Sequence, residues 1–194
     1  MDLNGKQVLL ISPEPWEGLQ LSKHDLARAL RDQGCTVTFW GPPTKGAFRT
    51  RLREDEGVRV VHYRHWLRGV NRLGKALHLR YYRRAILRLE ALNGRPFDII
   101  WCFDISRMQW FPEHGALKIL HLADHDILYD HPGTGLIRTA HMVYTVTDPL
   151  RKAVKELVPE ANVEHVGHMV SDHWLERTEA ITVQPQARTV ALAG

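Results

Sequence analysis

The chain has 194 residues, 44% of them hydrophobic and 25% charged, a composition typical of a globular domain with a sizeable core. The longest apolar run near the amino terminus, residues 8–11, is too short for a signal peptide or a membrane span. The two cysteines, Cys35 and Cys102, lie in apolar segments, which predicts buried free thiols in a reducing cytoplasm and excludes a disulfide scaffold.

The formal net charge of +4 is unevenly distributed. Residues 45–96 contain 14 Lys and Arg against 4 Asp and Glu, so this sector is basic while the rest of the chain is acidic. A basic sector of this kind predicts an anionic partner, which could be phosphate, nucleic acid or lipid head groups. The alternative is a solvated helix face without a partner.

The first elements predict a βαβ unit. KQVLLIS (6–12) predicts a buried strand, and after the loop PEPWEGLQ a helix is expected from Ser22, as N-cap, to Gly34. CTVTFW (35–40) predicts the second strand, parallel to the first and joined to it by a right-handed crossover. The expected inner face of the helix comprises Leu26, Ala29 and Leu30.

The remaining elements extend the sheet. A long helix is expected from Gly74 to Leu92 and a shorter one from Thr147–Asp148 to Val158, with Pro149 in its first turn. In the long helix the residues expected to face the sheet are Leu79, Tyr82, Ile86 and Leu89. Further strands are expected at 58–63, 97–104, 118–123, 142–146 and 163–166. The order predicts a doubly wound, mostly parallel α/β sheet of Rossmann-like type, which binds ligands at the carboxyl ends of its strands.

The carboxyl-terminal segment predicts a domain boundary. We expect a Rossmann-like domain over residues 1–176, a polar linker over 177–188, and in TVALAG (189–194) the first strand of a second domain of a longer protein. The alternative for the last segment is a closing edge strand of the same sheet.

Three stretches carry a family resemblance: residues 9–40, from LLISPEPWEG to TFW; ILHLADHD (119–126); and residues 142–174, from MVYTVTDPL to SDHW. In their order and spacing they resemble the amino-terminal domain of GT-B glycosyltransferases, especially the retaining family 4. This resemblance implies transfer of a sugar from a nucleotide-sugar to a glycan or lipid-linked acceptor, such as a bacterial surface glycan. It also implies that the donor-binding residues belong to the second domain, so that this chain alone is inactive.

The sequence departs from the family pattern at three places. The first loop has only Gly18 after Glu17 where many members have a Gly-Gly pair. Residues 167–170 read Gly-His-Met-Val where the turn often reads Asn-Gly-Val-Asp, and Thr147 replaces the usual serine. These differences bear on the subfamily and substrate more than on the fold.

The segment after the 118–123 strand contains Asp124, His125 and Asp126. By resemblance, His125 takes the place of the histidine that contacts the donor sugar, with Asp126 beside it as the second catalytic residue and Asp124 as a substrate contact. A metal site is the first alternative, because Asp124-x-Asp126 matches the metal-binding pattern of GT-A enzymes. His121 and His125 are four apart, but on a strand four residues span about 13 Å, so they cannot converge on a metal. The second alternative is an ordinary polar turn; no metal or cofactor is expected.

The first loop and helix start are the second candidate site. A helix amino terminus attracts anions and a glycine permits close approach of a ligand, so substrate contacts are expected from Trp16, Glu17, Gly18, Lys23 and His24. Trp16 could stack on a sugar ring or cap the core. The chain has no G-x-G-x-x-G motif, which argues against a bound dinucleotide. Thr147, at the start of the later helix, is a further expected substrate contact by resemblance.

The long helix carries the basic sector's most regular feature. Arg80, Arg84 and Arg88 are spaced four residues apart, so on a helix each lies only about 40° around the axis from the one before it. The three arginines therefore form one stripe. Nearby Trp66, Tyr81 and Tyr82 favour a membrane interface, so we expect a cytoplasmic protein bound peripherally to the anionic inner membrane. Nucleic acid is not expected because no recognisable binding motif accompanies the arginines. The alternative to an enzyme is a non-catalytic module that binds a nucleotide or phosphosugar.

Overall fold

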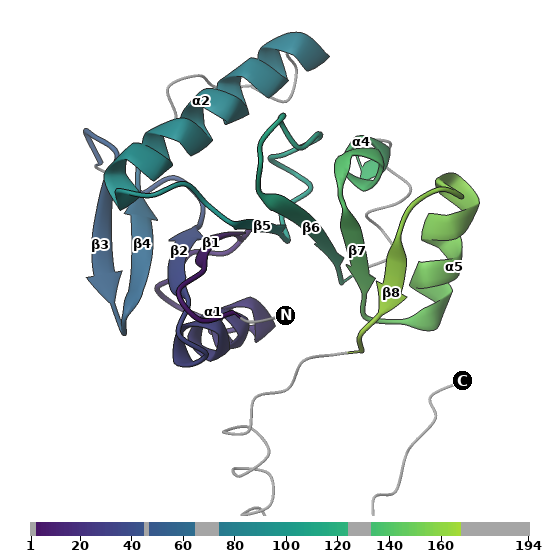
Figure 1. Ribbon diagram of the computed structural model, residues 1–194, viewed down its shortest axis with the longest axis horizontal. Coiled ribbons are helices and arrows are strands. Elements are labelled where there is room, and N and C mark those ends of the chain that lie inside the picture. The colour runs from purple at the N-terminus through teal and green to yellow at the C-terminus, as the bar shows by residue number, and fades with distance from the viewer. Residues whose placement is uncertain (1–2, 45–46, 65–73, 124–132, 168–194) are drawn as a thin grey trace, which may run out of the picture.

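The computed structural model describes residues 3–44, 47–64, 74–123 and 133–167, and within them it shows an eight-stranded sheet flanked by helices (Figure 1). The strand order is β3-β4-β2-β1-β5-β6-β7-β8. All neighbouring strands are parallel except β3 and β4. The strands are β1 (Gln7–Ile11), β2 (Thr36–Trp40), β3 (Arg51–Asp55), β4 (Val58–His62), β5 (Ile99–Cys102), β6 (Leu117–Leu122), β7 (Met142–Thr145) and β8 (Val163–His165). The predicted doubly wound α/β fold is therefore confirmed.

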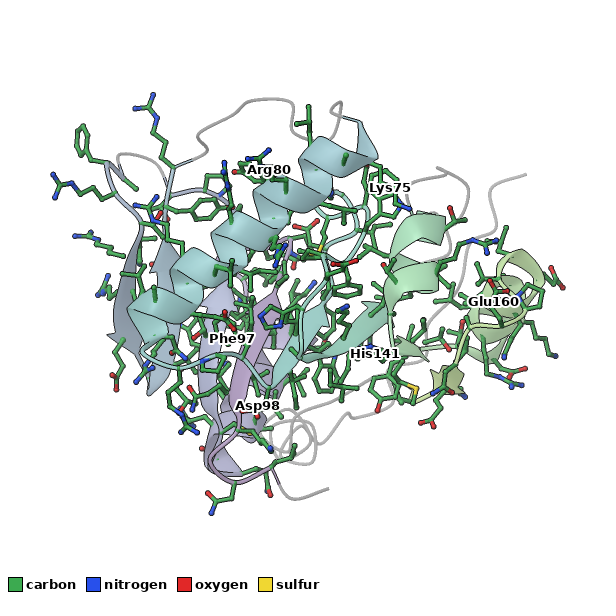
Figure 2. All side chains as sticks on the ribbon, turned by 45° about the horizontal axis from the view of Figure 1, so that its top comes forward. Lys75, Arg80, Phe97, Asp98, His141 and Glu160 are labelled. Atoms are coloured by element: carbon green, nitrogen blue, oxygen red, sulfur yellow. The ribbon has the colours of Figure 1, made fainter. Side chains whose placement is uncertain are left out.

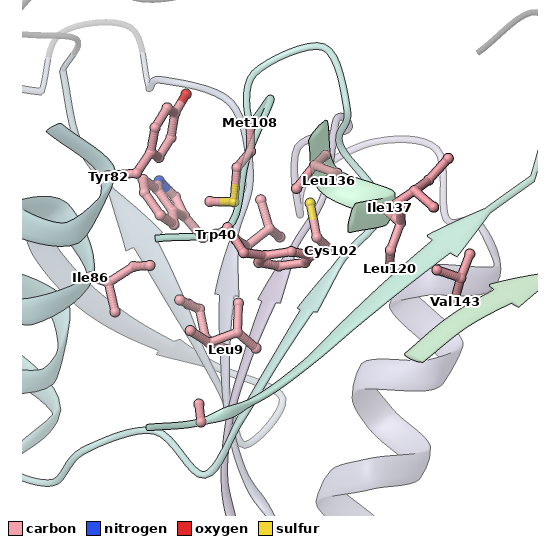
Figure 3. Packing of buried hydrophobic residues seen from close by; sticks show 14 of the residues in the cluster. Leu9, Trp40, Tyr82, Ile86, Cys102, Met108, Leu120, Leu136, Ile137 and Val143 are labelled. Atoms are coloured by element: carbon pink, nitrogen blue, oxygen red, sulfur yellow. The ribbon is translucent and has the colours of Figure 1, made fainter. Parts of the chain in front are cut away.

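The helices cover the two faces of the sheet. They are α1 (Ser22–Asp32), α2 (Lys75–Asn93), α4 (Gly133–Thr139) and α5 (Asp148–Leu157). Buried side chains of α1 belong to one core cluster, whereas those of α2, α4 and α5 belong to a second cluster on the other face (Figure 1). In this second cluster Trp40 from β2 packs near Tyr82 from α2 and Met108 (Figure 3). Both faces of the central strands are thus buried, which explains their continuous apolar sequences.

Two elements were not predicted. β3 is mostly exposed and contains a single apolar residue, Leu52, so its sequence carries no strand periodicity. It forms a hairpin with β4 through Glu56 and Gly57, whose φ angles of 49° and 72° are those of a type I′ turn. The second element, α4, is only 7 residues long and begins in a Gly-Thr-Gly sequence of low helix propensity.

Two helix faces differ from the expectation. In α1 the N-cap is Leu21 rather than Ser22, and the buried side chains are His24, Ala27 and Leu30, while Ala29 is exposed and Leu26 is half-buried. The helix is rotated because the His24 imidazole turns inward to hydrogen-bond with the preceding loop. In α2 the inward positions of Tyr82, Ile86 and Leu89 are confirmed, but His78 is buried in place of the half-buried Leu79.

Some expected features lie outside the described residues, namely Asp124, His125, Asp126, Trp66, the 177–188 linker and the 189–194 strand. Across the described ranges, none of the helices has the length and apolar character needed to cross a bilayer.

Candidate functional site at the carboxyl edge of the sheet

The strand order reverses on either side of β1 and β5, and this pair forms the switch point of the sheet. From β1 the chain proceeds outward through β2 to β4, and from β5 it proceeds in the opposite direction through β6 to β8. Connections that diverge in this way leave a crevice at the carboxyl edge of the two central strands. The side chains that follow β1, β5 and β6 are therefore the candidates for ligand contact.

Arg107 organises one side of this edge. It lies in the loop after β5 with 13% of its side chain exposed, and its Nε donates to Asp104 Oδ2 at 2.5 Å. Its two terminal nitrogens donate to the Tyr63 hydroxyl at 2.7 Å and to the carbonyls of Ser12 and Gly41 at 2.7 and 2.5 Å. Burial opposes the charged form of Arg107, but Tyr63 and Asp104 outweigh it and raise its pKa. These four partners are the residues that follow β1, β2, β4 and β5, so one guanidinium group holds together the loops at the ends of four strands.

No motif in the sequence predicted Arg107. The sequence signal that could have indicated it is the Asp-x-x-Arg spacing directly after a buried strand. A carboxylate at the start of a turn commonly accepts hydrogen bonds from the backbone N–H groups that follow it. Asp104 does so here, accepting from the backbone of Ser106 and Arg107, each at 3.0 Å.

On the α1 side of the edge, Lys23 is oriented by a carboxylate. Its Nζ lies 2.5 Å from Glu14 Oε2, and 13% of its side chain is exposed. Glu14 in turn accepts a hydrogen bond from the Ser12 hydroxyl at 3.2 Å. The predicted substrate contact Lys23 is therefore positioned at the carboxyl end of β1, with its charge close to the edge.

His24, by contrast, points away from the edge. It is fully buried, with Nε2 donating to the Pro15 carbonyl at 2.9 Å and Nδ1 accepting from the Leu21 backbone N–H at 3.0 Å. Both ring nitrogens are used within the chain. The geometry assigns His24 to fixing the loop, in contrast to the expected substrate contact.

Trp16 also lies in the core. It is 4% exposed, packs edge-on against Phe39 at a centroid distance of 5.0 Å, and donates from Nε1 to Asp55 Oδ2 at 3.1 Å. The Arg28 guanidinium lies 5.2 Å from its ring centroid. Because its faces are covered, the packing favours the core-capping alternative over stacking on a sugar ring.

His121, which the sequence placed only within a strand, lies near the end of β6. It is 3% exposed and stacks on Phe103 at 4.5 Å between ring centroids. Burial, with a smaller contribution from the Lys23 charge, lowers its pKa to about 4, so the imidazole is neutral at pH 7. Its Nδ1 has no hydrogen-bond partner within the described ranges, which is uncommon for a buried polar atom.

The other predicted contacts occupy more open positions. Glu17 is exposed, with Oε1 3.9 Å from His62 Nε2. Gly18 has φ of 110°, and a Cβ added there would meet no atom within 4 Å, so a ligand can approach its backbone. The Thr147 hydroxyl caps α5 by accepting from the Leu150 N–H at 3.3 Å. Arg80, Arg84 and Arg88 lie on α2, in a separate region from Lys23 and His121.

Together these positions define an edge that carries two positioned cations, Lys23 and Arg107, the buried neutral imidazole of His121 and the open backbone of Gly18. Such groups bind hydroxyls and anions through hydrogen bonds. In the described part of the chain, no group of three His, Cys, Asp or Glu side chains is placed to hold a metal ion.

Comparison with known proteins identifies a fold. No family model matches the sequence, and no curated protein does either. Two solved structures of sucrose-phosphate synthase from Thermosynechococcus elongatus are similar to this chain. The first has TM-score 0.57 and 13% identity, covering 90% of this chain and 97% of the other. The second has TM-score 0.56 and 12% identity over 84% of this chain and 48% of the other, so this chain spans about half its length. This chain therefore shares the fold of these two structures.

Proposed function

We propose that this chain is the acceptor-side domain of a GT-B glycosyltransferase resembling family 4, which transfers a sugar from a nucleotide-sugar to a glycan or lipid-linked acceptor. The main support is the carboxyl edge formed by β1, β5 and β6, where Lys23 and a neutral His121 lie near each other in a fold shared with sucrose-phosphate synthase. A cation there suits the phosphates of a donor or acceptor, and a neutral imidazole suits a sugar hydroxyl.

In this proposal His125 and Asp126 carry the catalytic contacts. In the sequence they follow Leu122, the last residue of β6, by only a few positions, and doubly wound sheets bind ligands at the carboxyl ends of their strands. The Asp126 carboxylate accepts the N–H of the neutral His125 imidazole and orients the ring, and the other ring nitrogen accepts a hydrogen bond from a hydroxyl of the donor sugar. Glu17, Gly18, Lys23, Asp124 and Thr147 are the proposed substrate contacts around them.

The test uses the full-length protein that contains this chain, with transfer from radiolabelled nucleotide-sugars as the measurement. His125→Ala is expected to lower turnover on the order of a hundredfold, because a lost transition-state contact costs roughly 2–4 kcal/mol. Its melting temperature should stay within about 2 °C of the wild type, since the proposal gives this side chain a contact with substrate and not a packing role in the core. Nucleotide-sugar binding without transfer by the wild type would instead identify a non-catalytic binding module.

We further propose that the stripe of Arg80, Arg84 and Arg88 on α2, within the basic sector, attaches the protein to an anionic membrane surface. The described arginines of the α2 stripe are all exposed, as attachment requires. A lipid-linked acceptor would be met at such a surface, which gives attachment a role in the transfer.

A further inference from the structure

A cavity of about 620 Å³ lies between α2 and the strands β2 and β4, at some distance from Lys23 and His121. We call it the α2 groove. Its floor is formed by Trp40, Val61, Tyr63 and Leu89, and its mouth by Thr50, Leu77 and the α2 arginines. The volume falls within the roughly 300–1,000 Å³ typical of small-molecule sites.

The floor of the α2 groove is apolar and belongs to the core. Trp40, Val61, Tyr63 and Leu89 are between 2% and 6% exposed. Leu77, at the mouth, is 57% exposed, so an apolar surface continues from the core to the solvent. A hydrocarbon group in the α2 groove would therefore be removed from water along most of its length.

The rim of the α2 groove is basic. Arg64 follows β4, while Arg80, Arg84 and Arg88 lie along α2, where Figure 2 shows Arg80 nearer the end that begins at Lys75. Among the residues that the structure describes, no acidic side chain lines the α2 groove. Arg64, Arg80 and Arg84 form no ion pair with a carboxylate of the described ranges.

This arrangement differs from that of other arginines on the surface. Arg28, Arg138 and Arg151 each have a carboxylate within 2.8 Å. Around the α2 groove, Arg64, Arg80 and Arg84 bring like charges together without a carboxylate of the described ranges, which is unfavourable unless an anion joins them. Guanidinium groups pair with phosphate through two parallel hydrogen bonds, so several arginines at one rim suit a phosphate head.

We propose that the α2 groove binds one anionic amphiphile, with a phosphate head on the arginines and a hydrocarbon chain on the apolar floor. The floor is recessed between a helix and two strands, so it accepts a single chain rather than a flat bilayer. The same arginines serve the membrane attachment proposed above, but this inference does not depend on sugar transfer because its test measures binding alone.

The test is calorimetric titration of the intact protein with decyl phosphate, below the concentration at which it forms micelles. One molecule is expected to bind per chain. Decyl maltoside, which has the chain without the charge, and inorganic phosphate, which has the charge without the chain, should each bind about tenfold more weakly or worse. Equal affinity for either control probe would overturn the proposal.

Matched variants locate the site. Arg80→Glu combined with Arg84→Glu should weaken decyl phosphate binding about tenfold or more, since two favourable charges become repulsive. Leu77→Asn should also weaken it, and because this side chain is exposed the fold is retained. Arg83, exposed on α2 outside the α2 groove, provides the control, and Arg83→Glu should leave the affinity within about twofold. If Arg83→Glu weakens decyl phosphate binding as much as the double variant does, general attraction to the charged surface is responsible and the proposed site is wrong. The proposal is also wrong if the protein binds anionic vesicles but does not bind monomeric decyl phosphate.

Discussion

At the scale of single residues, the contacts that shape the carboxyl edge join distant parts of the chain. Arg107 contacts Gly41 and Ser12 across 66 and 95 residues of sequence. Hydrophobic periodicity predicts which residues are buried, but it does not predict which carbonyls meet a buried guanidinium. The same reason explains His24, whose partners depend on how the first loop folds over α1. Lys23 could be selected from the sequence because the start of a helix is a local signal, and its role as a substrate contact stays a prediction.

His121 should make stability depend on pH. Its pKa in the folded chain is about 4, against an ordinary value of 6.5. As pH falls from about 6.5 to 4, the unfolded chain binds a proton that the folded chain does not, so folding stability is lost across this window. The loss amounts to at most roughly 3 kcal/mol, since one pKa unit corresponds to about 1.4 kcal/mol.

Urea unfolding at pH 7 and pH 4.5 would measure this effect. His78, whose pKa burial also lowers, contributes in the same direction, so the wild type is compared with His121→Phe, which keeps the stacking on Phe103. Between pH 7 and pH 4.5, the free energy of unfolding should fall by about 2–3 kcal/mol less in the variant than in the wild type. An identical loss in both proteins would show that the imidazole is not held neutral.

At the scale of elements, helix and strand positions were predictable wherever the apolar pattern was strong. The strands of the central sheet and the starts of α2 and α5 lie within a few residues of their predicted positions. β3 was not predictable because its pairing comes from a type I′ turn and not from its own side chains. The inner face of α1 was displaced because a buried polar residue, His24, replaced an apolar one.

Thr147 links an element to the candidate site, and its capping role can be measured. Thr147→Ala should lower the free energy of unfolding by about 1 kcal/mol, because the hydroxyl satisfies an N–H at the start of α5. Thr147→Ser keeps the acceptor and should stay within about 0.5 kcal/mol of the wild type. Denaturant unfolding distinguishes the two. A serine variant as unstable as the alanine variant would show that the methyl packing, and not the cap, matters.

At the scale of the whole molecule, the uneven distribution of charge is the basis of the proposed attachment to a membrane. Replacing Arg80, Arg84 and Arg88 by glutamate should abolish co-sedimentation with anionic vesicles, because each basic residue near such a surface contributes about 1 kcal/mol. Binding by the wild type should weaken as salt rises. Glutamates at Arg51, Arg53 and Arg83 produce the same change in net charge on exposed positions outside the stripe. If this control variant loses binding equally, net charge and not the stripe is responsible.

The two edges of the sheet have a consequence for association between copies of the chain. An edge strand offers unpaired N–H and C=O groups to any other strand, which favours aggregation. Here one edge is β3, where Arg51, Arg53 and Glu54 are exposed, and the other is β8, which is only 3 residues long. Charged side chains and a short strand both oppose intermolecular pairing. Strand β3, whose sequence has no recognisable strand pattern, therefore separates the apolar central strands from the strands of a neighbouring molecule.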